Sequence, residues 1–300
     1  MDGILAVWKP AGWTSHDVVA KVRGITKLKR IGHAGTLDPM VTGVLPLCLG
    51  RATRVVEYLQ ERPKAYEAVL QLGISTDTED MTGNVVNEVP AVHVKEEQLL
   101  RVLDGFKGTI DQVPPMYSAV KVDGKRLYEL AREGKTAERK PRQVEIYDIR
   151  LLEAELEPDR PRIRFYVECS KGTYIRTLCV DIGKALGVPA AMAELVRTMS
   201  GGLTRSDCLT LEQIAELQQA GKLAEQLLPA DAALSHFRRI EAPRPVADKG
   251  LKGQKISLAR LNVRLEDGEN AVLYADDGSF IGIFRADYGT GALRPVKVFS

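Results

Sequence analysis

The spacing of apolar residues along the chain predicts a series of strands and helices. Runs that are apolar, or that alternate with polar residues, predict strands at 4–8, 65–72, 144–152 and 162–169. Apolar residues at helical spacing predict helices from Thr14 to Gly24, at 96–106 and 126–134, from near Tyr174 to before Gly187, and at 190–197 and 211–227. Residues 31–50 are rich in glycine and proline, so we expect a long ordered loop there, leading to a short helix near 51–60.

The pattern changes after about residue 235. Short apolar runs at 263–265, 271–274, 280–284 and 296–299 are separated by Asp-Gly and Glu-Asp-Gly turns, which is typical of a small β-barrel or sandwich. We therefore expect two domains, 1–235 and 236–300, with the boundary at 232–242. Several strand pairs of the first are close enough in sequence for hairpins, which favours an α+β fold with a mixed, largely antiparallel sheet. No Walker or G-x-G-x-x-G sequence follows a strand, which argues against a nucleotide-binding fold.

Composition adds little beyond an ordinary globular protein. The 300 residues are 44% hydrophobic and 27% charged, with a net charge of +2. The four cysteines form no C-x-x-C pair and have no histidine at zinc spacing, so we expect reduced thiols and a cytoplasmic protein. The start of the chain lacks the basic stretch of a signal peptide, and no apolar run approaches the ~18 residues of a membrane span.

Basic residues gather in three stretches, at 18–37, 121–142 and 238–264. Separated basic stretches suit a track for a phosphate backbone, because each phosphate contact releases a condensed counterion. Solvated protein faces explain such stretches comparably well. Charge alone therefore leaves both interpretations open.

The strongest candidate for chemistry is Asp38, within the run GHAGTLDPMVTG over 32–43. Pro39 biases the Asp38 backbone to an extended conformation, and the glycines on both sides let the main chain approach a ligand. The structural alternative is an Asp helix cap followed by proline. A carboxylate nucleophile needs a nearby cation, and Arg176 is a distant candidate. On a strand, Arg176 and Tyr174 would share a face; the alternative is a structural arginine at a helix start.

Other candidates are weak when taken singly. Tyr66, His33 and Leu195 are each of a kind that is usually found in the core or in loops. The acidic turn Thr76–Asp80 suggests calcium, but Met81 falls on a ligand position and no glutamate follows at the required distance. We therefore expect no metal site.

Several longer motifs occur in order over residues 1–200: Lys9-Pro10-x-Gly12-x-Thr14-Ser15, the run 32–45, Gly73-x-x-Thr76-Asp77-Thr78-x-Asp80, Gln112-x-Pro114-Pro115-x-Tyr117-Ser118-Ala119-x-Lys121, Cys169 to Arg176, and Leu195-x-Arg197. Together they resemble the bacterial tRNA pseudouridine-55 synthases of the TruB type. The tail beyond 235 is similar, less distinctly, to the PUA-like RNA-binding domain of that family.

The resemblance implies isomerisation of uridine 55 in the T-loop of tRNA to pseudouridine, without a metal or cofactor. It assigns Asp38 as the nucleophile on a flipped-out uridine and leaves open whether C1′ or C6 is attacked. Arg176 would pair with Asp38 and keep it ionised. Tyr66 would stack on the uracil and is a candidate for helping to remove the C5 proton.

The resemblance also implies residues that bind the substrate. Tyr174 and Leu195 would line the base pocket, His33 would fill the place left by the extruded nucleotide, and Asp80 is a weaker candidate for contacting flipped nucleotides. Segment 124–143 corresponds to a mobile RNA-clamping element. The expected partner is the T-arm of tRNA, bound by a monomer without an obligate protein partner or membrane, and a tRNA-folding chaperone role is compatible with the same surface.

Three alternatives remain at this point. A guide-RNA-dependent relative would need further components, although the compact tail favours a stand-alone enzyme. A non-catalytic RNA-binding protein could use the same surface. A carboxylate-dependent glycosidase would need a second acid near the first, and the sequence places none convincingly.

Overall fold

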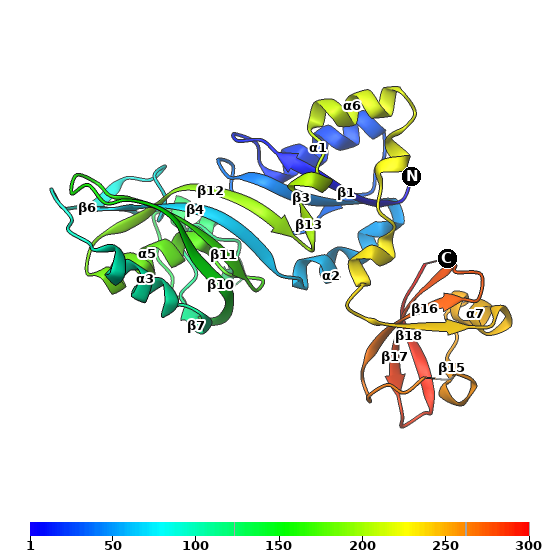
Figure 1. The fold of residues 1–300 in the computed structure, drawn as a ribbon. Helices are drawn as coiled ribbons and strands as arrows, with labels where there is room; N and C mark the ends of the chain where they lie inside the picture. Colours follow the sequence, from blue (N-terminus) through cyan, green and yellow to red (C-terminus); the bar gives the residue numbers. More distant parts are fainter. Residues whose placement is uncertain (123, 262, 300) are drawn as a thin grey trace.

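The computed structural model describes residues 1–122, 124–261 and 263–299. Within these residues, a large sheet is built by the first two thirds of the chain and a smaller one by the segment after Phe237. The smaller sheet lies beyond the end of the large sheet that carries β1 and α2 (Figure 1). In the part of the chain that the structure describes, no helix is long and apolar enough to cross a membrane.

The large sheet is mixed and largely antiparallel, as the sequence predicts. Its strands follow the order β1-β3-β12-β4-β11-β10-β7, with β2 added to β3 and β13 to β12. The strands are β1 (Gly3–Lys9), β2 (Ile31–His33), β3 (Thr42–Leu49), β4 (Lys64–Leu72), β7 (Gly108–Gln112), β10 (Arg142–Glu155), β11 (Arg162–Cys169), β12 (Ala190–Ser200) and β13 (Leu203–Thr204). The one parallel pairing among these strands joins β3 to β12, so it unites the amino-terminal part of the sheet with the rest.

Helices cover the two parts of the large sheet separately. The helices α3 (Glu96–Asp104) and α5 (Ile175–Leu186) pack on β4, β10, β11 and β12 around a core that includes Phe165 and Leu178. The helices α1 (Ser15–Thr26) and α6 (Leu211–Gln219) pack on β1 and β3 around Val18 and Leu47. The remaining helical segments of this part are η1 (Gly50–Val55), α2 (Val56–Glu61), η2 (Arg205–Asp207), η3 (Leu223–Gln226) and η4 (Ala230–Leu234).

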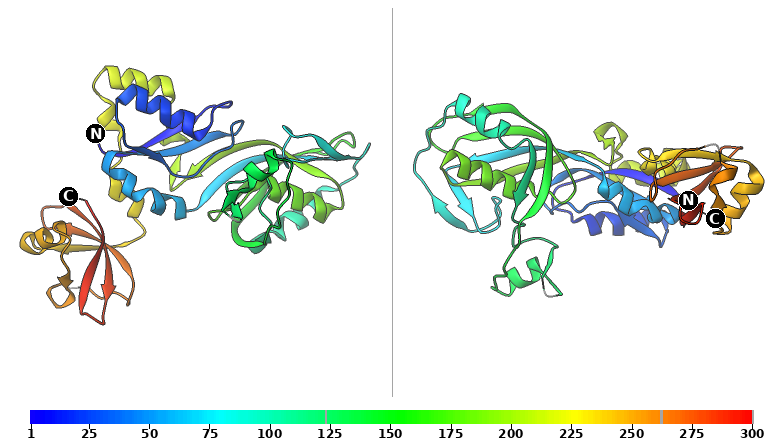
Figure 2. Two further views of the ribbon diagram at one scale, coloured as in Figure 1. Left: turned by 180° about the vertical axis from the view of Figure 1, so that it is seen from behind. Right: turned by 90° about the horizontal axis from the view of Figure 1, so that it is seen from below.

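Two small hairpins extend from this framework. One joins β5 (Ile74–Thr76) to β6 (Val85–Glu88) through the acidic turn, and the other joins β8 (Lys121–Val122) to β9 (Lys125–Arg126) ahead of α4 (Leu127–Arg132). The segment with α4 stands out from the rest of the molecule when it is seen from below (Figure 2).

The chain after Phe237 forms a five-stranded sheet with the order β14-β16-β17-β18-β15. Its elements are β14 (Arg238–Ala242), α7 (Arg244–Leu251), β15 (Ile256–Ser257), η5 (Leu258–Arg260), β16 (Asn270–Ala275), β17 (Phe280–Asp287) and β18 (Ala292–Val298). Phe284 and Leu273 lie in the core beneath α7, which confirms a small β-fold of the expected kind. The apolar run 263–265 is not a strand.

Further local predictions are wrong, and the predicted helix at 211–227 ends at Gln219. Residues 190–197 form strand β12 instead of a helix, because pairing with β3 and β4 overrides the helical propensity of alanine, methionine and leucine. The predicted loop at 31–50 contains strands β2 and β3, and β3 is buried along nearly its whole length and so shows no alternation. Helix α1 passes Gly24 and ends only at Lys27, whose φ of 60° lies in the left-handed region.

Candidate active site

Asp38 lies in the loop between β2 and β3, and neighbouring segments fix this loop on both sides. The Leu37 N–H donates to Ser15 Oγ (2.9 Å), at the first turn of α1. The Gly12 N–H donates to the Pro39 carbonyl (2.9 Å). The loop is thus held directly before and after Asp38, whose side chain remains 45% exposed. The carboxylate is presented to solvent from a fixed backbone.

Two buried cations complete the support of this loop. Lys9 is fully buried, and its Nζ donates to the carbonyls of Pro39 (2.9 Å), Pro10 (2.9 Å) and Trp13 (2.5 Å). Arg197 is 1% exposed, and its guanidinium donates to the carbonyls of Val44 (2.8 Å) and Gly35 (3.0 Å). A buried charged group is stable only when hydrogen bonds satisfy it. Lys9 and Arg197 therefore use these backbone carbonyls as their hydrogen-bond partners.

Gly43 permits the close approach that brings Arg197 to this loop. Its φ is 126°, and a Cβ at this position would lie 2.2 Å from the Arg197 carbonyl oxygen. The parallel pairing of β3 with β12 runs through these two residues. A larger side chain would push the two strands apart.

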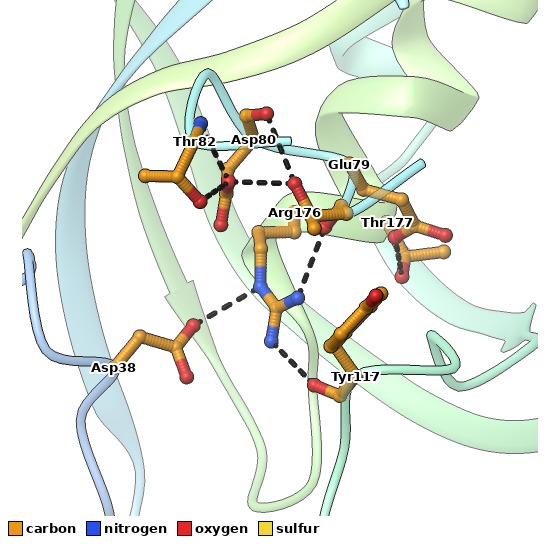
Figure 3. A network of polar contacts seen from close by, with 8 residues as sticks. Asp38, Glu79, Asp80, Thr82, Tyr117, Arg176 and Thr177 are labelled. Atoms are coloured by element: carbon orange, nitrogen blue, oxygen red, sulfur yellow. Dashed lines mark hydrogen bonds and ion pairs between the residues drawn. The ribbon is translucent and has the colours of Figure 1, made fainter. Parts of the chain in front are cut away.

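Arg176 connects three distant segments (Figure 3). Its Nε pairs with Asp38 Oδ2 at 3.0 Å, its Nη1 donates to the Thr78 carbonyl (3.0 Å), and its Nη2 donates to the Tyr117 carbonyl (2.9 Å). The Arg176 side chain is 7% exposed. Its position in the first turn of α5 excludes the strand geometry and matches the alternative of an arginine at a helix start, yet it still reaches Asp38.

The acidic turn between β5 and β6 is shaped by its own side chains. Asp80 Oδ1 accepts hydrogen bonds from Thr78 Oγ1 (2.8 Å) and from the Thr82 backbone (2.9 Å). Glu79 has a φ of 66°, and its Oε2 accepts from Thr177 Oγ1 (2.6 Å) (Figure 3). Burial raises the pKa of Glu79, and the Thr177 hydrogen bond opposes this. The turn therefore presents the Thr78 carbonyl to Arg176.

Tyr66 and Leu195 lie on neighbouring strands beside the ion pair. Tyr66 on β4 is 7% exposed and is paired in register with Arg197, while Leu195 on β12 is opposite Ala68. Side chains alternate along a strand, so Tyr66 and Leu195 share one face of the sheet. Burial raises the pKa of Tyr66 to about 12; the charge of Asp38 acts in the same direction, and that of Arg197 opposes it.

Tyr174 and His33 lie at the borders of this region. Tyr174 is the N-cap of α5 and has no side-chain cap hydrogen bond. The His33 ring packs edge-on against His16, with ring centroids 5.2 Å apart, and among the described residues its buried Nδ1 has no hydrogen-bond partner. Burial lowers the pKa of His33, and the charge of His16 acts in the same direction.

Sequence reasoning left three polar residues without a role. Arg197 and Gln112 occur within the quoted motifs, and Glu79 was noted only as part of the acidic turn. In the structure, Arg197 and Gln112 are almost completely buried. The available signal for Arg197 and Gln112 was that these polar residues occur in the motifs although no catalytic role requires them. Among residues 1–122, 124–261 and 263–299, no three acidic, histidine or cysteine side chains group as a metal site would require.

Comparison with known proteins identifies the class of enzymes to which this chain belongs, the pseudouridylate synthases. A model of the TruB family pseudouridylate synthase N-terminal domain matches residues 23–175, and one of the tRNA pseudouridylate synthase B C-terminal domain matches 176–235. This chain belongs to the TruB family, which confirms the resemblance predicted from its motifs. It is therefore a pseudouridine synthase, an isomerase.

Individual relatives match over almost the full chain. The tRNA pseudouridine synthase B of Bacillus licheniformis is 46% identical, covering 99% of this chain and 97% of that protein. That of Staphylococcus aureus is 46% identical, covering 100% and 99%. Among solved structures, a Cbf5-Nop10-Gar1 complex matches with a TM-score of 0.79 and 28% identity, covering 99% of this chain and 85% of that chain.

Proposed function

We propose that this protein isomerises uridine 55 in the T-loop of tRNA to pseudouridine, with Asp38 as the nucleophile. Relatives that are 42–46% identical over the full chain are named tRNA pseudouridine synthase B, which supports tRNA as the substrate. The observation that carries the assignment to Asp38 is its 3.0 Å contact with Arg176, at the surface end of an otherwise buried cation. In the reaction the N1–C1′ bond breaks, the uracil turns, and a C5–C1′ bond forms; C5 loses its proton and N1 takes one up, so that substrate and product are isomers.

The surroundings of the ion pair support a base pocket. An enzyme that acts on a stacked base must extrude it, at a cost of a few kcal/mol, and stacking on an aromatic ring returns about 1–3 kcal/mol. Tyr66 offers a ring on the same sheet face as Leu195, and Tyr174 begins the helix that carries Arg176. We propose that the Tyr66 ring stacks on the uracil and that its hydroxyl is the candidate for helping to remove the C5 proton.

Further contacts to the RNA are proposed from position and charge. His33, which ends the strand before the Asp38 loop, is proposed to fill the space that the uridine leaves. The Oδ1 atom of Asp80 accepts hydrogen bonds within the turn. A contact between Asp80 and flipped nucleotides would therefore use its other carboxylate oxygen. The projecting segment 124–143 carries Lys125, Lys135 and Lys140 on its exposed surface and would clamp the RNA.

The wider organisation follows the same proposal. We assign residues 1–235 to catalysis and 236–300 to a PUA-like RNA-binding domain, whose exposed basic residues include Lys249, Lys252 and Lys255. The protein would act on the T-arm as a monomer in the cytoplasm, in keeping with four free cysteines, and could open the tRNA elbow as a folding chaperone without chemistry. This chain covers 97–99% of the tRNA pseudouridine synthase B relatives but 85% of the matched chain in the Cbf5 complex. This difference supports a stand-alone enzyme.

Activity of the purified protein on an unmodified tRNA transcript tests this function. We expect pseudouridine at position 55 without added protein or guide RNA, and none in a matched transcript with cytidine at that position. A strict requirement for other components would favour the guide-dependent alternative. Release of free uracil would favour a glycosidase.

A further inference from the structure

One buried amide joins the segment that leads into the RNA clamp to the start of helix α5. Gln112, the last residue of β7, is 2% exposed. Its Nε2 donates to the Tyr174 carbonyl (3.0 Å), and its Oε1 accepts from the Tyr174 N–H (2.7 Å). An amide has both a donor and an acceptor, so it satisfies both backbone groups of one residue at once. No ionised side chain can do this.

The contact lies two residues before Arg176, at a helix N-terminus without a side-chain cap. Tyr174 is the N-cap of α5, and its side chain makes no capping hydrogen bond. The Gln112 amide thus fixes the backbone from which Arg176 extends toward Asp38.

The same segment touches Arg176 a second time. Five residues after Gln112, the Tyr117 carbonyl accepts from Arg176 Nη2 (2.9 Å). Pro114 and Pro115 lie between the two contacts, are buried, and restrict the backbone. Arg139, on the return path from the clamp, donates to the Pro114 carbonyl (3.1 Å). Residues 112–117 therefore form a short, stiff strap, held at both ends to the first turn of α5.

The strap is also continuous with the clamp. The backbone N–H groups of Tyr128 and Leu127, which begin α4, donate to the carbonyls of Ser118 (3.1 Å) and Val120 (2.8 Å). These acceptors directly follow Tyr117. The clamp helix, the strap and Arg176 are thus linked by consecutive hydrogen bonds.

We propose that Gln112 is a positioning residue for the isomerisation: it sets the start of α5 and the strap so that Arg176 faces Asp38. Gln112 touches neither the uridine nor the ion pair and acts through Arg176. This inference rests on the proposed function, because it concerns the alignment of the proposed nucleophile.

The test compares Gln112→Ala with the wild type and with Gln219→Ala, a matched change at an exposed glutamine at the end of α6, outside the proposed site and clamp. Isomerisation is measured in single turnover, with saturating enzyme and tritium released from C5 of the target uridine. We expect Gln112→Ala to lower the rate constant by about tenfold to a hundredfold, the effect of a small misalignment of reacting groups. The dissociation constant for tRNA should change by less than about threefold, and Gln219→Ala should match the wild type.

This readout separates positioning from folding. A loss of folded protein lowers the active fraction but leaves the single-turnover rate constant unchanged, so an unchanged rate constant would overturn the proposal. Gln112→Glu keeps the volume and the acceptor but removes the donor to the Tyr174 carbonyl; it covers the case in which the alanine variant does not fold, and it should also be slow.

A double-mutant cycle then tests the route through Arg176. In an Arg176→Lys background the ion pair is already misaligned, so adding Gln112→Ala should slow the reaction by less than about threefold further. A full additional tenfold loss would show that Gln112 acts independently of Arg176 and would contradict the proposal. If the wild type itself forms no pseudouridine, the proposed function fails, and that outcome is visible before any variant is compared.

Discussion

Replacing Arg176 by lysine keeps the positive charge but removes the geometry of the site. The guanidinium directs three N–H groups to Asp38, the Thr78 carbonyl and the Tyr117 carbonyl, at 2.9–3.0 Å. A single ammonium at the end of a flexible chain cannot bond all three in those directions. Hydrogen bonds to a charged group contribute roughly 1.5–3 kcal/mol each, so losing one or two of them costs between about 1.5 and 6 kcal/mol. We take a loss of about 2–4 kcal/mol from the middle of that range.

If that loss falls on the aligned ion pair, the isomerisation slows by roughly 30-fold to 1000-fold, at 1.36 kcal/mol per factor of ten. Single-turnover tritium release measures the rate constant, and filter binding measures the affinity for tRNA, which should be little changed. Arg162→Lys is the matched control, because Arg162 pairs with Glu194 on the exposed face of the sheet. An Arg176→Lys enzyme within threefold of the wild type would refute the claim that the three-way contact aligns Asp38.

The remaining predictions concern stability and binding. Gly43→Ala should lower the free energy of unfolding by at least ~3 kcal/mol and Tm by roughly 6–12 °C. The reason is that a Cβ would lie 2.2 Å from the Arg197 carbonyl oxygen and that φ at this position is positive. A melting curve that matches the wild type would count against the close approach of β3 and β12. Because the pKa of His33 is lowered from 6.5, the unfolded state binds its proton more readily, so stability falls as pH drops below about 6.5; His33→Asn should lose less stability over that range in denaturant titrations, and an identical slope would argue against the shift. Raising salt from about 50 to about 200 mM should weaken tRNA binding steeply, whereas a flat response would mean that the basic stretches are only solvated faces.

The sequence predicted the sheet class and most helices because their signals are local. The Thr14–Asp17 capping box and the glycine after α5 specify helix ends through backbone hydrogen bonds that adjacent residues make. Strand β12 was missed because its identity depends on pairing with β3 and β4, which lie far away in the sequence. Strand β3 was missed because both of its faces are buried, which removes the alternation that would mark it.

The candidate site was predictable where motifs pointed to chemistry. The motifs named Asp38 and Arg176, and the structure brings them into contact. They could not show that Arg176 also donates to the carbonyls of Thr78 and Tyr117. Every residue has a backbone carbonyl, so the residue type does not reveal which carbonyl serves as a partner. The burial of Lys9 and Arg197 was equally hidden, since lysine and arginine are usually found at the surface.

Asp38→Asn tests the central claim most directly. Asparagine keeps the size of the side chain and an oxygen that can accept from Arg176, but it removes the carboxylate that we propose as the nucleophile. We expect no pseudouridine in single turnover with excess enzyme, while tRNA affinity stays within about tenfold of the wild type, a difference of ~1.4 kcal/mol. Pseudouridine formed at the wild-type rate by this variant would show that the carboxylate at position 38 is not the group that attacks the uridine.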